Sequence, residues 1–423
     1  MEYKINCPHC FNQFDQKEVL FKKSKAKNES QFDDQNLIYP QKENCEFICD
    51  EDGFVVSAKD YSGNLFNNRV CPNCHNSLPH KYGKYPVKRI VIAGVAGCGK
   101  TVYLSSLLSN IQTYCTRFNI SCSPQSESVK NYVQNNNIEK GKPLPQATLI
   151  DGDIVPLSID MQFNNEDRSK TIVTIVFYDF AGEEILSHSN RAQEAINHAD
   201  GIIFLQDPIQ FQRIIKDESP NMYDSGLQTM IRLMVASDYC SIPMAVGISK
   251  CDRLIDDGIF NSKLVETLNE PVKPAENFKG FCAVDYNRIS KAIDDFYRNI
   301  DNQTRTALKT SFDCFNYFAV SALNCKLVVS DENILVPAET PHPMRIEEPL
   351  FWLFNQFGFI NSDVDVLEHA VVGKISQLNE QRIMWEKQLS EAQQKKLFGK
   401  KRVKECEENL NRINKYIQEL VNS

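Results

Sequence analysis

The sequence lacks long apolar runs and an excess of positive charge. No stretch of about 18 apolar residues, the length that crosses a bilayer, occurs in the 423 residues. The opening residues are not followed by the apolar segment of an export signal. We therefore expect a cytoplasmic protein without a transmembrane segment. The formal net charge of −8 disfavours a protein that clamps nucleic acid over its whole surface, because phosphate binding needs a basic face.

The overall composition is that of a folded protein. Apolar residues make up 42% of the chain and charged residues 24%, which argues against global disorder. The unusual count is cysteine, with 15 residues scattered along the chain. Because the chain has no export signal, we expect reduced thiols, with any clusters binding metal.

The chain divides into three predicted regions. Residues 1–85 hold six cysteines, residues 86–360 alternate apolar runs with helix-like stretches, and residues 361–423 contain no proline. Strands separated by helix-length spacers predict an α/β fold with a doubly wound, mostly parallel sheet in the middle region. An asparagine-rich run at 131–137 predicts a loop. The expected strands are Val87–Ala93, Thr171–Tyr178, Gly201–Leu205, Met244–Ile248 and Tyr317–Val320.

The middle region begins with a phosphate-binding loop motif. It fits G-x-x-x-x-G-K-[ST] and lies between an apolar strand and a helical stretch, Val102–Ile111. Its glycines let successive backbone N–H groups converge on a phosphate at the positive end of the helix. Lys100 is the expected catalytic cation between the β- and γ-phosphates, and the Thr101 hydroxyl is an expected Mg²⁺ ligand. The expected nucleotide contacts here are Gly94, Ala96, Gly97, Cys98, Gly99, Lys100, Thr101 and Val102, with Cys98 only a small spacer.

Three downstream motifs, each at the end of an apolar run, favour GTP over ATP. Asp179 is placed to hold Mg²⁺ through water, and the N–H of Gly182 to contact the γ-phosphate. A carboxylate at Asp252 can accept hydrogen bonds from guanine N1 and N2, donors that adenine does not present in that arrangement. The guanine-binding motif begins with Ser249, and the aliphatic stem of Lys250 can cover the ring. The last motif offers a backbone N–H to guanine O6 from Ser321, Ala322 or Leu323.

In this order the four motifs resemble those of the TRAFAC class of P-loop GTPases, over roughly residues 87–330. The segment Ala199–Asp207, typical of the strand after the second switch, adds to the resemblance. The resemblance implies a doubly wound sheet with the nucleotide at the carboxyl ends of the strands. It also implies a cycle in which GTP, as substrate, and Mg²⁺, as cofactor, order two switch loops that hydrolysis releases.

The sequence departs from the family pattern in the guanine motif and in both switches. Ser249 replaces the usual Asn, which predicts weaker bracing of the phosphate-binding loop. Thr148 is, by position, the best-placed hydroxyl for the second Mg²⁺ contact. Glu183 stands where many of these GTPases place a water-orienting Gln, and as a catalytic base its charge would repel the γ-phosphate. We therefore expect slow intrinsic turnover, with any arginine finger supplied by a partner.

Two matching Cys-Pro-x-Cys turns predict a structural zinc site in the first region. Each turn places two thiolates within reach of one tetrahedral Zn²⁺, and two such turns complete a four-cysteine site. The turns lie much further apart than the ~15–20 residues of a compact zinc ribbon, which predicts a long insertion. A redox role is the alternative, and the duplication disfavours it. The expected zinc ligands are Cys7, Cys10, Cys71 and Cys74.

The rest of the first region leaves two questions open. We expect Cys45 and Cys49 to be free thiols, with a second metal site involving a nearby histidine as the alternative. Basic and acidic residues are nearly balanced, and the basic cluster at 22–27 is followed by acidic residues. This favours a structural or protein-docking role over nucleic-acid binding.

The third region carries two apolar heptad stripes, which predict a coiled-coil element. Between the stripes lies Gly399, and glycine costs ~1 kcal/mol inside a helix. A helical hairpin is therefore favoured slightly over one long helix. The stripes are Val371, Ile375, Leu378, Arg382, Trp385, Leu389 and Ala392, then Val403, Cys406, Leu410, Ile413, Ile417 and Leu420.

These features together predict a GTP-binding and GTP-hydrolysing switch of a bacterial multi-protein system, with a zinc ribbon and a coiled-coil output element. The architecture and the segment Glu348–Leu353 resemble the bacterial double-GTPase family. That resemblance implies protein partners, such as an activating protein, a second GTPase or a coiled-coil partner. Two alternatives stay open: a nucleic-acid-associated NTPase that uses the ribbon and the basic tail, or a non-hydrolysing scaffold with a structural nucleotide.

Overall fold

The computed structural model divides the chain into two compact units. The first comprises Met1–Lys273 and Asp285–Ile360, and the second comprises Pro274–Val284 and Asn361–Ser423. The residues that the structure describes are 3–23, 37–42, 45–123, 126–145, 155–164, 170–179, 190–208, 211, 226–270, 281–331, 333–362, 378, 382–390, 393 and 399–421.

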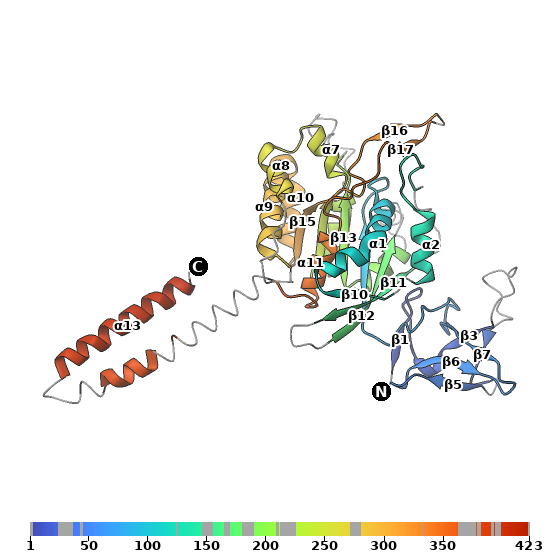
Figure 1. Cartoon of the computed structure of the whole chain (residues 1–423), viewed down its shortest axis with the longest axis horizontal. Helices are drawn as coiled ribbons and strands as arrows, with labels where there is room; N and C mark the ends of the chain where they lie inside the picture. Colours follow the sequence, from blue (N-terminus) through green and yellow to red (C-terminus); the bar gives the residue numbers. More distant parts are fainter. Residues whose placement is uncertain are drawn as a thin grey trace. The chain divides into compact units, whose positions relative to one another are not determined.

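The largest sheet of the first unit has seven strands in the order β10–β11–β12–β9–β13–β14–β15 (Figure 1). Strands β12, β9, β13, β14 and β15 run parallel to one another, whereas β11 is antiparallel to both β10 and β12. The predicted mixed α/β fold with a mostly parallel sheet is therefore confirmed. The strands are β9 (Val87–Ala93), β10 (Ile120–Cys122), β11 (Leu157–Asn164), β12 (Lys170–Asp179), β13 (Gly201–Gln206), β14 (Met244–Ile248) and β15 (Phe315–Ala319).

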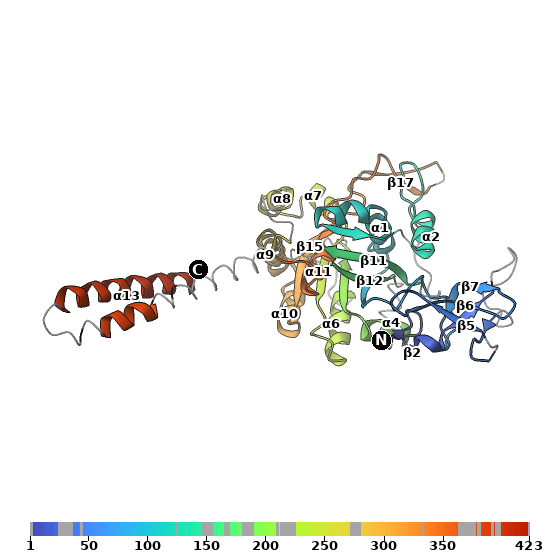
Figure 2. The same ribbon diagram turned by 60° about the horizontal axis from the view of Figure 1, so that its bottom comes forward.

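Helices cover both faces of this sheet. Every residue of β13 is buried, as expected for a parallel strand between two helical layers. Phe204 belongs to the same core cluster as Met230 of α6, while a Cβ at Gly201 would meet Leu353 of α11 at 3.0 Å. Figure 2 shows α1 on one side of the sheet and α6 on the other. The helices are α1 (Lys100–Arg117), α2 (Glu127–Asn135), α4 (Asn190–Asn197), α6 (Gly226–Ala236), α7 (Cys251–Asp256), α8 (Ser262–Asn269), α9 (Ala283–Ile300), α10 (Asn302–Ser311) and α11 (Glu348–Gln356).

Residues 131–137 are not the loop that their asparagine content predicts, because most of them belong to α2. Ser126 caps this helix, since its side chain accepts a hydrogen bond from the N–H of Val129. Val129 is fully buried, and the Ser126 hydroxyl also donates to the carbonyl of Ser158 on β11. The cap and these tertiary contacts outweigh the low helix propensity of asparagine.

Residues 3–85 form a small β module, the N-terminal ribbon. Its strands pair as β1–β2, as β4–β3–β8 and as β5–β6–β7. The module packs on the end of β12, where the Tyr178 hydroxyl donates to the carbonyl of Pro8 at 2.9 Å and Phe11 stacks on His198. The strands are β1 (Lys4–Asn6), β2 (Gln13–Asp15), β3 (Leu20–Lys22), β4 (Leu37–Ile38), β5 (Glu46–Cys49), β6 (Val55–Lys59), β7 (Leu65–Phe66) and β8 (Asn68–Val70), with a 3-10 turn at Gln16–Glu18.

A two-stranded hairpin, β16 (Leu327–Val329) with β17 (Leu335–Pro337), extends the chain after β15. The carbonyl of Pro337 accepts a hydrogen bond from the N–H of Gly141, in the segment that follows α2. This hydrogen bond therefore joins the hairpin to the segment after α2, although the two are far apart in the sequence.

The second unit contains α13 (Gly399–Val421), which begins at the glycine between the two heptad stripes. The helical residues 382–390 lie beside α13 in both views, as a hairpin requires (Figures 1 and 2). The heptad residues Cys406 and Ile413 are buried, whereas Ile383, outside the stripes, is 61% exposed. None of the helices within the described ranges is both long and apolar enough to span a membrane.

Candidate functional site

The parallel strands bring the predicted motifs to one edge of the sheet. The predicted phosphate-binding loop (P-loop), residues 94–101, follows β9, while Asp179 ends β12 and Ser249 follows β14. Strand β9 lies between β12 and β13. The strands that follow β9 directly in the sequence, β10, β11 and β12, lie on one side of it, and the later strands β13, β14 and β15 lie on the other. Such a switch in strand order opens a crevice at the carboxyl ends of the strands, where α/β proteins bind ligands.

The loop at residues 94–99 is closely packed on one side and open on the other. Gly94 packs so closely against β13 that a Cβ there would lie 2.3 Å from the carbonyl oxygen of Leu205. Gly97, with a left-handed φ of 75°, has open space where a Cβ would point. The loop is therefore fixed on its inner side and open on its outer side, where Ala96 is exposed.

Lys100 is the first residue of α1 and is 6% exposed. Its ammonium donates to the carbonyls of Gly94 at 3.0 Å and Val95 at 3.2 Å, so it lies inside the loop. The neighbouring Cys98 is fully buried, and burial raises the pKa of its thiol. Cys98 is thus a neutral packing residue, which agrees with its predicted role as a spacer.

Two hydroxyl groups converge on the carboxylate of Asp179. Thr101 Oγ1 donates to Asp179 Oδ2 at 2.9 Å, and the hydroxyl of Tyr132 on α2 donates to the same oxygen at 2.7 Å. Burial, followed by the negative charge of Asp179, raises the pKa of Tyr132, so the phenol stays protonated as a donor. The two predicted Mg²⁺ ligands are therefore in contact, together with a tyrosine that the motifs do not indicate.

Lys250 joins the guanine motif to the P-loop. Its backbone has a left-handed φ of 48°, and its ammonium donates to the Gly97 carbonyl at 2.6 Å and to Asp207 Oδ2 at 3.1 Å. The Ser249 hydroxyl donates instead to the carbonyl of Gln206 at 2.9 Å. Lys250, rather than the residue before it, thus contacts the phosphate-binding loop.

Asp252 lies in the first turn of α7, and its Oδ1 atom is buried without a hydrogen-bond partner. The N–H of Cys251 beside it donates to the carbonyl of Val320, which brings the guanine motif against the last motif. The backbone N–H of Ser321 already donates to the carbonyl of Met344 at 3.0 Å. Of the three predicted donors to guanine O6, the backbone N–H groups of Ala322 and Leu323 therefore remain as candidates. Thr148, Gly182 and Glu183 lie outside the described residues.

The four predicted zinc ligands form the second site. Their sulfur atoms all lie within 4.8 Å of one another, a spacing that could hold a metal ion such as zinc. Cys7 Sγ lies 3.6 Å from Cys74 Sγ, and Cys10 Sγ lies 3.8 Å from Cys71 Sγ. Because zinc binds cysteine as the thiolate, metal binding at this cluster would release protons from these sulfurs.

The two turns that carry these cysteines have the same local structure. Each reads Cys-Pro-x-Cys-x-Asn, and the fifth residue is left-handed, with φ of 57° at Phe11 and 58° at His75. The final asparagine donates to the second sulfur of its own turn at 3.5 Å in both cases, from Asn12 and from Asn76. Cys45 and Cys49 belong to no comparable cluster among the residues that the structure describes.

Tyr132 and Asp207 are the site residues that the motif analysis did not assign. Tyr132 lies in the asparagine-rich run that predicted a loop, and it is 47 residues from Asp179 in the sequence, so no local pattern links the two. Asp207 could have been found from its position, because a carboxylate directly after the buried strand β13 falls on the same edge as the other motifs.

Comparisons with known proteins extend this picture only slightly. No protein-family model matches the sequence. The chain is 26% identical, over 201 residues, to a protein of Mycolicibacterium smegmatis that carries the name ESX-1 scaffolding and assembly protein SaeC. The match covers 44% of this chain and about half, 51%, of the relative. Part of the chain is therefore similar to part of a protein named for scaffolding and assembly.

Proposed function

We propose that this chain is a GTP-binding and GTP-hydrolysing switch that acts through protein partners. The observation that carries the proposal is the contact between separate motifs at one sheet edge. Lys250 of the guanine motif donates to Gly97 of the P-loop, and Thr101 of the P-loop helix donates to Asp179. A chance glycine-rich turn would not be expected to contact partners from two other predicted motifs.

The choice of guanine rests on Asp252. A buried carboxylate oxygen without a partner is costly in a folded protein, unless a ligand supplies the missing donor. Guanine offers two adjacent N–H donors, whereas adenine would leave the carboxylate unsatisfied. This oxygen therefore supports GTP over ATP as the substrate.

The residues around the loop also fit a Mg²⁺ ion. The hydroxyl of Thr101 and the carboxylate of Asp179 are hard oxygen ligands, which this ion prefers. Bound there, Mg²⁺ would neutralise charge on the transferred phosphate. Lys100 would contribute a second positive charge, because its bonds to two loop carbonyls are ones that a phosphate can replace. Thr148 and Glu183 complete the proposed site as the second Mg²⁺ contact and a weak base.

A structural zinc at Cys7, Cys10, Cys71 and Cys74 is part of the proposal. The ion would hold together a ribbon of short strands, and the ribbon would act as a docking module. The double-GTPase resemblance and a relative named for scaffolding and assembly both support protein partners, and we propose that the chain meets them in the cytoplasm. The relative also favours a second candidate, a scaffold whose nucleotide is bound but not hydrolysed.

Single-turnover assays on the full chain separate the two candidates. We expect phosphate release from GTP that is slow, needs Mg²⁺ and is abolished by Lys100→Ala. Binding of GTP without any release, alone or with partners co-purified with the chain, would favour the scaffold. Failure to bind GTP at all would reject both.

A further inference from the structure

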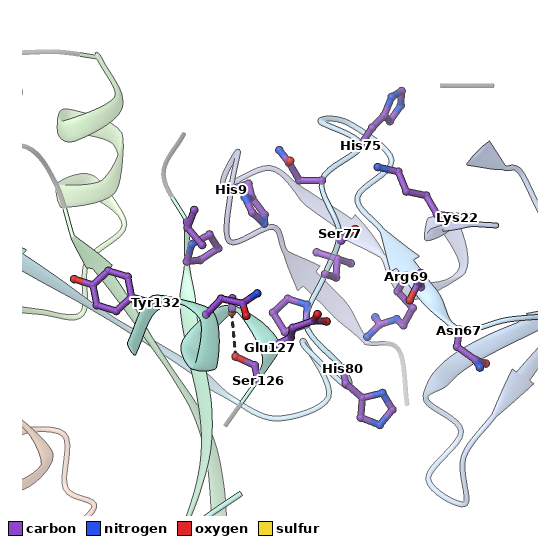
Figure 3. Close-up of a pocket in the computed structure, with 18 of the residues that line it drawn as sticks. His9, Lys22, Asn67, Arg69, His75, Ser77, His80, Ser126, Glu127 and Tyr132 are labelled. Carbon is purple, nitrogen blue, oxygen red and sulfur yellow. Dashed lines mark hydrogen bonds between the residues drawn. The ribbon is translucent and has the colours of Figure 1, made fainter. Parts of the chain in front are cut away.

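A cavity of about 1220 Å³ lies between the N-terminal ribbon and α2, within the first unit (Figure 3). It is larger than the ~300–1,000 Å³ of typical small-molecule sites. Residues of both metal-binding turns line one wall, including His9 and His75, and α2 lines the opposite wall from Ser126 to Asn135. Its size and its position between two modules suit a segment of chain better than a metabolite.

Asparagine side chains line both walls of the cavity, although two of the six already donate within the protein, Asn76 to Cys74 Sγ and Asn136 to the carbonyl of Tyr132. An amide offers both a donor and an acceptor, so it matches the N–H and C=O of a peptide group in an extended chain. Half of these amides come from the ribbon and half from α2 or the residue after it. They are Asn67, Asn68 and Asn76, and Asn131, Asn135 and Asn136.

The charges of the two walls differ in sign. Lys22 and Lys23 line the ribbon wall, whereas Glu127 of α2 and Glu194 of α4 line the other. A ligand with acidic side chains would be attracted to the ribbon wall and repelled from the helical wall, which fixes its orientation.

The ring of Phe11 in the lining is engaged elsewhere, which disfavours single-stranded nucleic acid. Binding of that kind relies on bases stacking on exposed ring faces. Phe11 instead stacks on His198, with ring centroids 4.9 Å apart. Figure 3 shows Tyr132 with its hydroxyl pointing away from the ribbon, and this hydroxyl is bonded to Asp179.

The same helix that lines the cavity also contacts the proposed Mg²⁺ site. Asn131 and Asn135 face the cavity, and Tyr132 between them donates to Asp179 at 2.7 Å. The C-terminal end of α2 is held by Ser105 of α1, whose hydroxyl donates to the carbonyl of Asn136. A ligand that moves α2 must therefore change the hydrogen bonds of Asp179.

We propose that this cavity binds an extended, acidic polypeptide segment of a partner, and that Tyr132 couples its occupancy to the nucleotide site. The coupling rests on the proposed GTPase function, whereas the binding site does not.

Fluorescence anisotropy with labelled oligo-L-glutamate tests the binding site on the full chain. We expect saturable binding that Lys22→Glu with Lys23→Glu weakens about tenfold or more, the loss expected for charge-assisted contacts. Asn131→Ala with Asn135→Ala should weaken it from the other wall, and alanine keeps α2 helical. The control is Lys59→Glu, an exposed change on the same ribbon outside the cavity. No saturable binding, equal binding by all variants, or preferential binding of labelled oligothymidylate would overturn the proposal.

The coupling is measured as a change in oligo-L-glutamate affinity when Mg²⁺ and a non-hydrolysable GTP analogue are added. We expect a change of about fivefold or more in the native chain, and none in Tyr132→Phe. If the analogue binds but the native chain has the same affinity for oligo-L-glutamate with and without it, the coupling is refuted. If the analogue does not bind, the proposed GTPase function fails, and the peptide experiment still decides the cavity.

Discussion

The hydroxyl of Tyr132 lies 2.7 Å from Oδ2 of Asp179 and donates a hydrogen bond to it. Thr101 donates to the same oxygen, so a helix outside the known motifs shares the carboxylate with the P-loop helix. This arrangement orients Asp179 before any ion arrives, and it makes Tyr132 a positioning residue for the proposed Mg²⁺ site.

Tyr132→Phe tests that role. The change removes a hydrogen bond to a charged carboxylate, worth about 1.5–3 kcal/mol, so the Mg²⁺ concentration for half-maximal nucleotide binding should rise about tenfold or more. The measurement is a Mg²⁺ titration of fluorescent GDP binding. Tyr61→Phe is the matched control, because Tyr61 is 88% exposed. An unchanged Mg²⁺ dependence in Tyr132→Phe would show that Thr101 alone orients the carboxylate.

Asp252→Asn should change the preferred base. An amide at position 252 can donate to the oxygen that xanthine carries in place of the guanine amino group. GTP affinity should therefore fall by about ten- to a hundredfold, the cost of one unsatisfied buried group, while xanthosine triphosphate binds better. Competition binding with both nucleotides measures the switch. Asp256→Asn, an exposed change on the same helix, should leave the preference unaltered. Undiminished GTP affinity in Asp252→Asn would place the guanine site elsewhere.

Cys74→Ser should release the metal of the ribbon. Three remaining sulfurs and a hydroxyl bind zinc more weakly, so the metal content of the purified chain should fall from one ion to close to none. The ribbon should also unfold at a lower temperature, because a bound ion would hold its short strands together. Metal analysis and calorimetry check both effects. Cys49→Ser, an exposed cysteine outside the cluster, should retain the ion.

The stability of the ribbon should depend on the charge of the Asp50 carboxylate and therefore on pH. A hydrogen bond from Lys84, 2.5 Å away, is the main cause that lowers the pKa of Asp50. The pKa of Asp50 in the folded protein lies below the unfolded value of ~3.9, so the ionised carboxylate stabilises the fold at neutral pH. This stabilisation is lost as the pH falls through the pKa of the folded state. Asp50→Asn should therefore cost about 1 kcal/mol at neutral pH and progressively less in acid. Unfolding of both chains across pH measures the difference, and the exposed Glu51→Gln should show none.

The sheet was predictable because its central strands are buried on both faces. Met244–Ile248 reads as one uninterrupted apolar run, and β14 has the same bounds. The contact between Thr101 and Asp179 was also predictable, because parallel strands place their carboxyl ends together. The convergence of Cys7, Cys10, Cys71 and Cys74 was predictable from the duplicated turn.

Contacts that depend on tertiary packing were not predictable. Helix α2 has low intrinsic propensity and is held by its cap and by burial of Val129, neither of which an asparagine-rich run reveals. The N–H of Ser321 is taken by Met344, from a segment after the β16–β17 hairpin whose path the sequence does not disclose. The position of Tyr132 follows from the same packing of α2.

The hydrogen bond between Tyr178 and Pro8 has a practical consequence. Pro8 lies inside the first metal-binding turn, and Tyr178 directly precedes Asp179 on β12. An oxidant or chelator that disorders the turn would therefore loosen the backbone next to the proposed Mg²⁺ ligand. Nucleotide affinities measured after purification without a reducing agent would describe a damaged protein, and metal content should be determined on every preparation before its nucleotide binding is compared.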